Sequence, residues 1–257
     1  MMHDNGMNDF SNKEHTLIIE GRNAVLEAFR SGKPIDKLFV LDGCQDGPVR
    51  TIIREAKKHD TIINYVGKER LSQLSETGRH QGVIAYAAAY EYADIEDMFA
   101  LAEKKGEDPF LILLDNIEDP HNLGAIIRTA NLVGAHGVII PKRRAVGLTA
   151  TVAKTSAGAL NYTPVAKVTN MAKTMDELKE RGLWFVCADM DGETMYRLNL
   201  TGPIGLVIGN EGEGVGRLVK EKCDFVAGIP MKGEIDSLNA SVAAGILAYE
   251  IVRQRMQ

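Results

Sequence analysis

Polar residues that could do chemistry follow directly on an apolar run in residues 115–130, DNIEDPHNLGAIIRTA. The segment begins after FLILL and carries carboxylates, Asn122 and one arginine, Arg128. On a helical wheel at about 100° per residue, Arg128 falls opposite the apolar face, so it should point outward. It is then either a solvated arginine or a ligand for a phosphate or a second subunit. The simplest interpretation of Asn122 is a helix N-cap, with Pro120 ending the strand.

A second candidate is the glycine-rich turn GLVIGNEGEGVG at residues 205–216, between an expected strand and an expected helix. Glycines there allow a ligand to approach the backbone closely. The spacing is neither GxGxxG nor a P-loop. Glu211 and Glu213 would repel phosphate and tolerate a cation, which favours a cofactor that lacks phosphate and carries positive charge. A glycine-rich connector with solvated glutamates is the alternative.

A third candidate is IPMKGEIDSLNASVAAGILAYE at residues 229–250. Ser237 or Asn239 can cap the final helix, which carries no charge from Ser241 to Tyr249. Its small residues would let a backbone, a cofactor or a partner chain come close. A buried terminal helix with a serine cap is the simpler alternative, but it does not explain the uncharged sequence SLN at residues 237–239.

The elements that must position these stretches form two α/β regions, with residues 1–16 expected to be a flexible tail. Residues 17–90 alternate short strands and amphipathic helices: strands at 16–20, 37–41, 61–66 and 82–88, and helices at 21–32, 47–60 and 67–78. Residues 91–108 predict a solvated acidic linker with a helical middle. Residues 109–257 predict a parallel sheet covered on both faces, with strands at 110–115, 137–140, 163–168, 183–190, 204–209 and 225–230 and helices at 122–133, 149–160, 171–182, 214–223 and 241–255. Ligands of such sheets bind beyond the carboxyl ends of the strands.

Charge and composition leave a nucleic-acid partner open, and they disfavour a metal-binding, secreted or membrane protein. The net charge of −5 is concentrated in residues 91–108, which carry −5, whereas residues 17–90 carry +2 and residues 109–257 carry zero. Nucleic acid is therefore neither supported nor excluded as a partner. Three dispersed cysteines without a CxxC favour a reducing cytoplasm, and no cysteine or histidine spacing indicates a metal site. No apolar run reaches the roughly 18 residues of a membrane span, and no signal peptide is expected at the N-terminus.

Taken together, NLGAIIRTA, LVIGNEGEG and IPMKGEIDSLNASVAAGI resemble motifs 1, 2 and 3 of the SpoU family of RNA ribose 2′-O-methyltransferases, in the SPOUT class. IIEGRNAVLEA and HQGVIA resemble parts of the small ribosomal-protein-like substrate-binding domain that precedes the catalytic domain in this family. The likeness is greatest to the bacterial enzymes that methylate a guanosine of 23S ribosomal RNA. A transfer RNA substrate and a non-catalytic RNA-binding module are the alternatives, and the missing GxGxxG disfavours a nicotinamide dehydrogenase.

The resemblance implies a deep trefoil knot in residues 109–257, S-adenosyl-L-methionine as cofactor, RNA as substrate and a homodimer with no membrane or metal requirement. It assigns residues to two roles: catalysis by Asn122, Arg128, Glu211, Ser237 and Asn239, and cofactor binding by Gly209, Ile229, Leu238, Met231 and Ser156. Within residues 17–90, Arg22 and Asn23 are candidate RNA contacts, and ordinary solvated surface side chains are the alternative. Because a guanidinium stays protonated, Arg128 is better suited to stabilise oxyanion charge or hold a phosphate than to act as a base.

Overall fold

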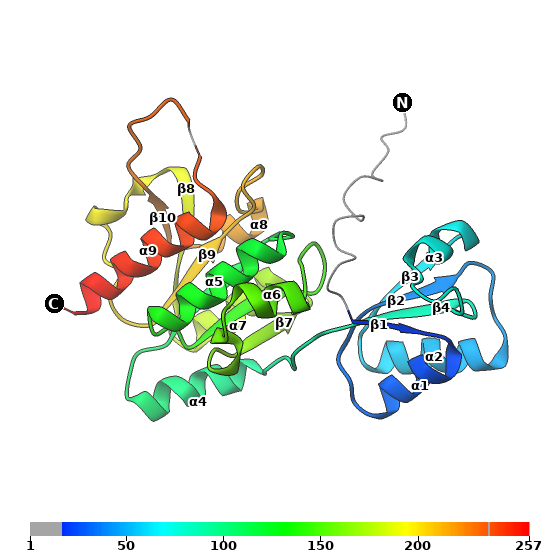
Figure 1. Ribbon diagram of the computed structural model, residues 1–257. Coiled ribbons are helices and arrows are strands. Elements are labelled where there is room, and N and C mark those ends of the chain that lie inside the picture. The colour runs from blue at the N-terminus through cyan, green and yellow to red at the C-terminus, as the bar shows by residue number, and fades with distance from the viewer. Residues whose placement is uncertain (1–16, 236, 257) are drawn as a thin grey trace. The chain divides into compact units, whose positions relative to one another are not determined.

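The computed structural model describes residues 17–235 and 237–256, which form two compact units (Figure 1). The N-terminal unit holds the described residues up to Glu91 together with Gly147–Thr151, and the C-terminal unit holds the rest. The predicted tail at residues 1–16 lies outside the described residues.

The N-terminal unit is a four-stranded sheet with helices on both faces. Its elements agree with the sequence prediction: β1 Leu17–Glu20, α1 Arg22–Arg30, β2 Ile35–Leu41, α2 Gly47–Lys58, β3 Ile62–Val66, α3 Lys68–Leu74 and β4 Val83–Ala87. The strand order is β1-β4-β2-β3, and only β2 and β3 pair in parallel. Because successive strand residues face opposite sides, Val83 and Ala85 pack with α1 and α2, whereas Ile84 packs with α3.

The C-terminal unit is built on a six-stranded sheet of order β10-β8-β9-β5-β6-β7 in which every pair is parallel, as predicted. Its elements are α4 Ile95–Lys105, β5 Phe110–Leu114, α5 Pro120–Leu132, β6 Gly137–Pro141, α6 Ala150–Thr155, the 3-10 turn η1 Ala159–Asn161, β7 Val165–Val168, α7 Met171–Glu180, β8 Trp184–Thr194, the 3-10 turn η2 Met195–Arg197, β9 Ile204–Ile208, α8 Arg217–Lys220, β10 Phe225–Gly228 and α9 Ala240–Arg255. By contacts, the first two residues of α6 are grouped with the N-terminal unit.

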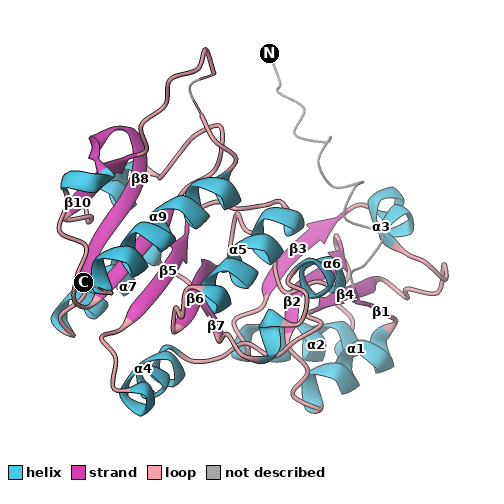
Figure 2. Cartoon of the chain, turned by 60° about the vertical axis from the view of Figure 1, so that its left-hand side comes forward, coloured by secondary structure: helices cyan, strands magenta, loops and turns pink. Residues whose placement is uncertain are grey.

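Both faces of this sheet are covered, which explains the continuous apolar strands. Leu111 and Leu113 of β5 pack in a core with residues of α4, α7 and α8. The alternate residue Ile112 faces the opposite side, where α5 and α9 lie next to each other (Figures 1 and 2). Sheet and helices together bring the carboxyl ends of β5, β8, β9 and β10 to one edge.

The acidic segment at residues 91–108 differs from the prediction of a solvated connector. Its helical middle is confirmed as α4, but Met98 and Ala102 are fully buried and Met98 belongs to the core of the C-terminal unit. The high charge of the segment concealed this apolar stripe, in which two residues four apart lie on one helix face.

The start of α5 is also displaced from the prediction. The N-cap is Asp119, whose side chain accepts a hydrogen bond from His121 N at 2.8 Å, and Pro120 is the first helical residue. Asn122, predicted as the cap, lies inside the first turn and is buried. At α9 the cap is Asn239, one of the two residues proposed for that position. Among the described helices, none is long and apolar enough to span a membrane.

Candidate active site

The glycine-rich turn after β9 folds back on itself. Asn210 and Gly214 form an isolated antiparallel bridge, with Gly214 N donating to Asn210 O at 2.8 Å. A Cβ on Gly209 would lie 2.1 Å from the Gly214 carbonyl carbon, and Gly214 has φ +68°. Gly209 must lack a Cβ and Gly214 must adopt a positive φ, and glycine meets both requirements without strain. The backbone of the turn that carries Glu211 therefore has a fixed conformation.

Glu211 joins the three stretches identified in the sequence. Its Oε1 accepts hydrogen bonds from Asn122 Nδ2 at 2.8 Å, from Asn239 Nδ2 and from the backbone N of Ala240 at 3.2 Å. Asn239 Nδ2 also donates to Asn122 Oδ1 at 2.9 Å. One carboxylate oxygen therefore ties the start of α5, the glycine turn and the start of α9 together.

Asn239 has little bonding capacity left for a substrate. Its amide nitrogen donates to Asn122 and Glu211, and its Oδ1 accepts from Ser241 N, Ser241 Oγ and Val242 N. An amide has two donor hydrogens and an acceptor oxygen with two lone pairs. The geometry gives Asn239 a positioning role within the cluster.

A cavity of about 240 Å³ lies beside the Glu211 cluster, at the carboxyl ends of β8, β9 and β10. Six of the predicted site residues line it: Gly209, Glu211, Ile229, Met231, Ser237 and Leu238. The position agrees with the rule that ligands of parallel sheets bind beyond the strand ends.

The electrostatics of this cavity favour a cation. Asp189, Glu211 and Glu213 contribute to its lining, and no Lys, Arg or His from residues 17–235 or 237–256 does. Partial burial alone would raise the pKa of Asp189, but the hydrogen bond from Lys220 and backbone hydrogen bonds outweigh burial, so the pKa lies below its ordinary value. The Asp189 carboxylate therefore stays charged at neutral pH. With three carboxylates and no basic side chain of the described residues in its lining, the cavity is poorly suited to a phosphate group.

Of the residues predicted for catalysis and cofactor binding, Arg128 and Ser156 belong neither to the cavity lining nor to the Glu211 cluster. Arg128 is exposed on the outward face of α5, as the helical wheel predicted, and its guanidinium bonds to no other described residue. Ser156 is fully buried just after α6, and its hydroxyl donates to Ala153 O at 2.9 Å. A buried hydroxyl bonded within its own turn is not available to the cavity, so the structure gives Ser156 a local structural role.

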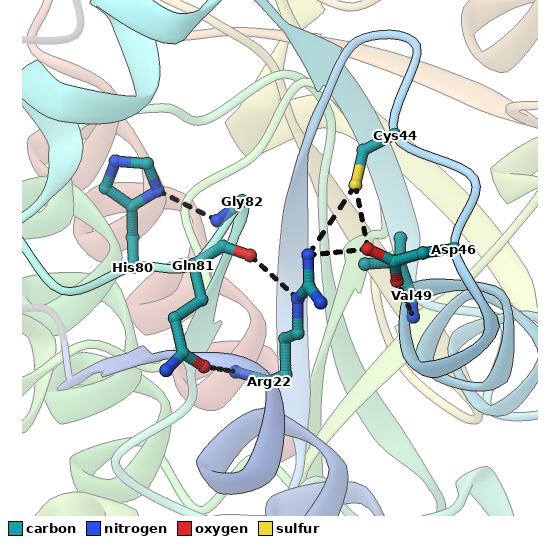
Figure 3. A network of polar contacts seen from close by, with 7 residues as sticks. All are labelled: Arg22, Cys44, Asp46, Val49, His80, Gln81 and Gly82. Carbon is teal, nitrogen blue, oxygen red and sulfur yellow. Dashed lines mark hydrogen bonds and ion pairs between the residues drawn. The ribbon is translucent and has the colours of Figure 1, made fainter.

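Arg22 and Asn23, the predicted RNA contacts, begin α1 in the N-terminal unit. The Arg22 guanidinium lies 2.6 Å from Asp46 Oδ2 and its Nε donates to Gln81 O at 3.0 Å, so its side chain holds two loops (Figure 3). Asn23 is exposed. Of the two, Asn23 is the more available for an RNA contact.

Two residues that sequence reasoning did not select also shape the site. Asp115 is buried after β5, and its Oδ2 accepts from Gly216 N at 2.8 Å. Asn210 Nδ2 donates to Asn116 O at 3.1 Å, and Asn210 Oδ1 accepts from Gly212 N. Asp115 directly follows β5, and Asn210 is the second residue after β9. Polar residues this close to the ends of two buried strands were the available signal, since neighbouring parallel strands end at the same edge.

Comparison with known families decides the class of the chain. Residues 109–249, more than half of it, match the SpoU rRNA methylase family. The chain belongs to this family. Residues 18–93 also match a domain described as RNA 2′-O ribose methyltransferase substrate binding. The chain is therefore an RNA methyltransferase of the SpoU family.

Relatives extend the match over nearly the whole chain. YacO of Bacillus subtilis, assigned by name to the TrmH family of tRNA/rRNA methyltransferases, is 53% identical over 245 residues, which cover 95% of this chain and 97% of YacO. The SpoU methyltransferase AviRb of Streptomyces viridochromogenes, solved in complex with its cofactor AdoMet, superposes with a TM-score of 0.59 at 26% identity and covers 94% of this chain and 91% of its own. A TrmH/SpoU tRNA modifying enzyme of A. aeolicus has a TM-score of 0.54 at 30% identity and covers 63% of this chain and 83% of its own.

The residues present fit the cofactor of this family, S-adenosylmethionine. Its sulfonium is a cation and its structure contains no phosphate, which agrees with a cavity lined by carboxylates and by no basic side chain of the described residues. Apolar side chains of Ile229, Met231 and Leu238 are available to cover an adenine ring, and the glycine turn leaves room for close backbone approach.

Proposed function

We propose that this SpoU-family chain methylates a ribose 2′-hydroxyl of RNA, and that its target is a guanosine of 23S ribosomal RNA. The observation that carries the proposal is the Glu211 cluster, which joins the three sequence stretches beside a cavity lined by carboxylates. The description of the matched N-terminal domain supports the ribose 2′-oxygen as the acceptor atom, and that of the matched family supports ribosomal RNA.

The cofactor supplies an electrophilic methyl group on a sulfonium, and the chain must align a weak nucleophile and help remove its proton. Ser237 is exposed and lines the cavity, and it would orient the hydroxyl. Arg128 would stabilise the charge that develops on the 2′-oxygen, or hold the neighbouring phosphate so that the phosphate accepts the proton. Asn122, Glu211 and Asn239 hold the elements that carry these groups.

A homodimer is part of the proposal because the outward face of α5 and α9 is apolar. Leu132 is 65% exposed, Val242 47% and Tyr249 53%. Val242 and Tyr249 are seven residues apart, so they lie on one side of α9. Arg128 precedes Leu132 by one helical turn and shares its face. Exposed apolar patches of this kind mark protein contacts, and a second copy would bring this Arg128 face into an interface.

Transfer RNA is the alternative substrate. The similarity to the A. aeolicus tRNA modifying enzyme favours it, but that similarity covers 63% of this chain. YacO, whose name covers both tRNA and rRNA, matches 95% of it and so supports either substrate. The trefoil knot and a cytoplasmic location stay predictions from the family resemblance and the composition.

The test supplies the purified chain with methyl-labelled S-adenosylmethionine and, separately, with unmodified ribosomal RNA and unmodified transfer RNA. We expect label in a guanosine of 23S RNA, in an alkali-resistant linkage, because a methylated 2′-oxygen cannot attack the adjacent phosphate. Label on a base would refute the acceptor atom, and label only in transfer RNA would establish the alternative. A chain that binds the cofactor and labels neither RNA would be a non-catalytic module.

A further inference from the structure

A second cavity, of about 430 Å³, lies in the N-terminal unit between the loop after β2, helix α2 and strand β3. Small-molecule sites commonly occupy roughly 300–1,000 Å³. The cavity is lined by Asp42, Gly43, Cys44, Gln45, Arg50, Ile53 and Tyr65. The proposed methyl transfer uses none of these residues, so this cavity needs an explanation of its own.

Its lining combines an aromatic ring, a cation and acceptor groups. Tyr65 is 55% exposed although it lies in a strand. The Tyr65 hydroxyl and the Arg50 guanidinium bond to no other part of the chain that the structure describes. Asp42 and Gln45 are exposed beside them. An exposed ring next to an arginine without such a bond is suited to stacking a base and contacting its phosphate.

The acceptor groups restrict the kind of base. A carboxylate such as that of Asp42 can only accept hydrogen bonds, so it favours a base edge with N–H donors. It would also repel a free polyphosphate. The Gln45 amide can accept or donate, and Ile53 supplies apolar contact beside the ring. These features together favour an unstacked nucleobase of single-stranded RNA over an anion or an apolar peptide.

The shape of the cavity wall depends on Arg22. Cys44 of the wall lies 4.0 Å from Arg22 Nη2 and 3.7 Å from Asp46 Oδ2, and Arg22 pairs with Asp46 (Figure 3). Asp46 also caps α2 by accepting from Val49 N at 3.1 Å, and α2 carries Arg50. The Arg22 contacts therefore fix both the loop and the helix that form the cavity.

We propose that this cavity docks one unpaired RNA base that has an N–H donor edge, with Tyr65 stacking on the base and Arg50 contacting its phosphate. Arg22 is then a positioning residue for the cavity. The inference rests on the proposed function in taking RNA as the partner, and it adds a base-specific contact outside the methyl-transfer site.

The experiment measures equilibrium binding of the full chain to unmodified ribosomal RNA over a range of salt concentrations. Tyr65→Ala should weaken binding at least about fivefold, whereas Tyr65→Phe should stay near wild type because its ring still stacks. Arg50→Ala should lower the slope of log affinity against log salt by about 0.7, the loss of one single-strand phosphate contact. Tyr65→Ala should leave that slope unchanged. Arg54→Ala, on the same helix with a largely exposed side chain, is the matched control and should change neither quantity.

Binding of S-adenosylhomocysteine by calorimetry should be the same in all these variants, which separates this site from the catalytic one. Tyr65→Ala with affinity within twofold of wild type would overturn the proposal. If the wild-type chain labels no RNA but Tyr65→Ala still binds RNA more weakly than wild type, the base-docking cavity is supported and the proposed methyl transfer is refuted. If wild type labels RNA and Tyr65→Ala binds it with unaltered affinity, the methyl transfer stands and the base-docking cavity fails.

Discussion

At the scale of single residues, Glu211 is the group on which the geometry of the site depends. Glu211→Ala removes one acceptor from three donors, Asn122 Nδ2, Asn239 Nδ2 and Ala240 N. We expect a loss of about 1–2 kcal/mol in the free energy of unfolding, because partly buried donors lose a charged partner. Affinity for S-adenosylhomocysteine should fall as well, since the loops that form the cavity lose the hydrogen bonds that hold them together.

Glu213→Ala is the control for this change. Glu213 lies in the same turn and is exposed, and its side chain bonds to none of the described residues. Urea unfolding of both variants provides the comparison of stability, and calorimetry of Glu211→Ala against wild type measures the cofactor affinity. Equal unfolding midpoints for Glu211→Ala and Glu213→Ala would show that the cluster does not hold the loops.

Arg128 presents the opposite case, an exposed cation with no structural partner among the described residues. Arg128→Ala should lower kcat on RNA by roughly 100-fold or more, the usual effect of removing a group that stabilises oxyanion charge. Affinity for S-adenosylhomocysteine should stay unchanged because Arg128 does not line the cavity. Arg217→Ala, another exposed arginine, is the control. Near-normal turnover in Arg128→Ala would rule out the role.

At the scale of elements, Glu20 at the end of β1 fixes the loop that follows α3. Its carboxylate accepts from Ser75 Oγ at 2.6 Å, Thr77 Oγ1 at 2.7 Å and the backbone N of Glu76 and Thr77. Burial alone would raise the pKa of Glu20, but these hydrogen bonds outweigh burial and hold it below its ordinary value of 4.5. The same segment supplies Arg22, which holds Gln81 at the far end of that loop.

Glu20→Gln should therefore destabilise the chain in a pH-dependent way. A carboxyl with a depressed folded pKa contributes stability above its unfolded pKa and loses it as pH falls through the folded pKa. The difference in urea midpoint between wild type and Glu20→Gln should be constant above about pH 5.5 and should narrow below 4.5. Glu69→Gln, exposed on α3, should show no such change. A difference that stays constant down to about pH 3.5 would contradict the assignment.

The type of each helix and strand was predictable from the sequence. The start of α5 and the burial of α4 were predicted wrongly, for physical reasons. Apolar runs such as 110–115 and 204–209 became the central strands because periodicity reports burial directly. α5 begins at Pro120 because an Asp-Pro pair supplies both a cap and a preset first residue, a stronger signal than Asn122. Average charge concealed the buried stripe of α4.

The site was less predictable than the strands. The three stretches could be selected by composition, but their meeting at a single oxygen of Glu211 depends on strand order, which periodicity does not contain. Ser156 carried no sequence signal that separates a hydroxyl bonded within its own turn from one facing a cavity. Arg22 looked like a free surface cation because its partners, Asp46 and Gln81, are distant in the sequence.

At the scale of the whole molecule, the proposed homodimer accounts for features that one chain leaves unexplained. A single subunit exposes Leu132, Val242 and Tyr249 on the outward face of α5 and α9, together with Arg128, the proposed reactive cation. A specific protein interface buries at least about 1,200 Å² in total and has an apolar centre. If this face is that centre, assembly and catalysis should fail together.

The double variant Leu132→Glu, Tyr249→Glu should sediment as a monomer, because carboxylates facing their own copies across an apolar interface repel and cannot be solvated. Its methyl transfer to RNA should fall at least tenfold while its urea midpoint changes little, since both side chains are exposed in the single chain. Tyr65→Glu, an exposed tyrosine of the N-terminal unit, should keep the wild-type sedimentation. A double variant that stays dimeric would place the interface elsewhere, and a monomeric one with full activity would show that Arg128 works without the partner subunit.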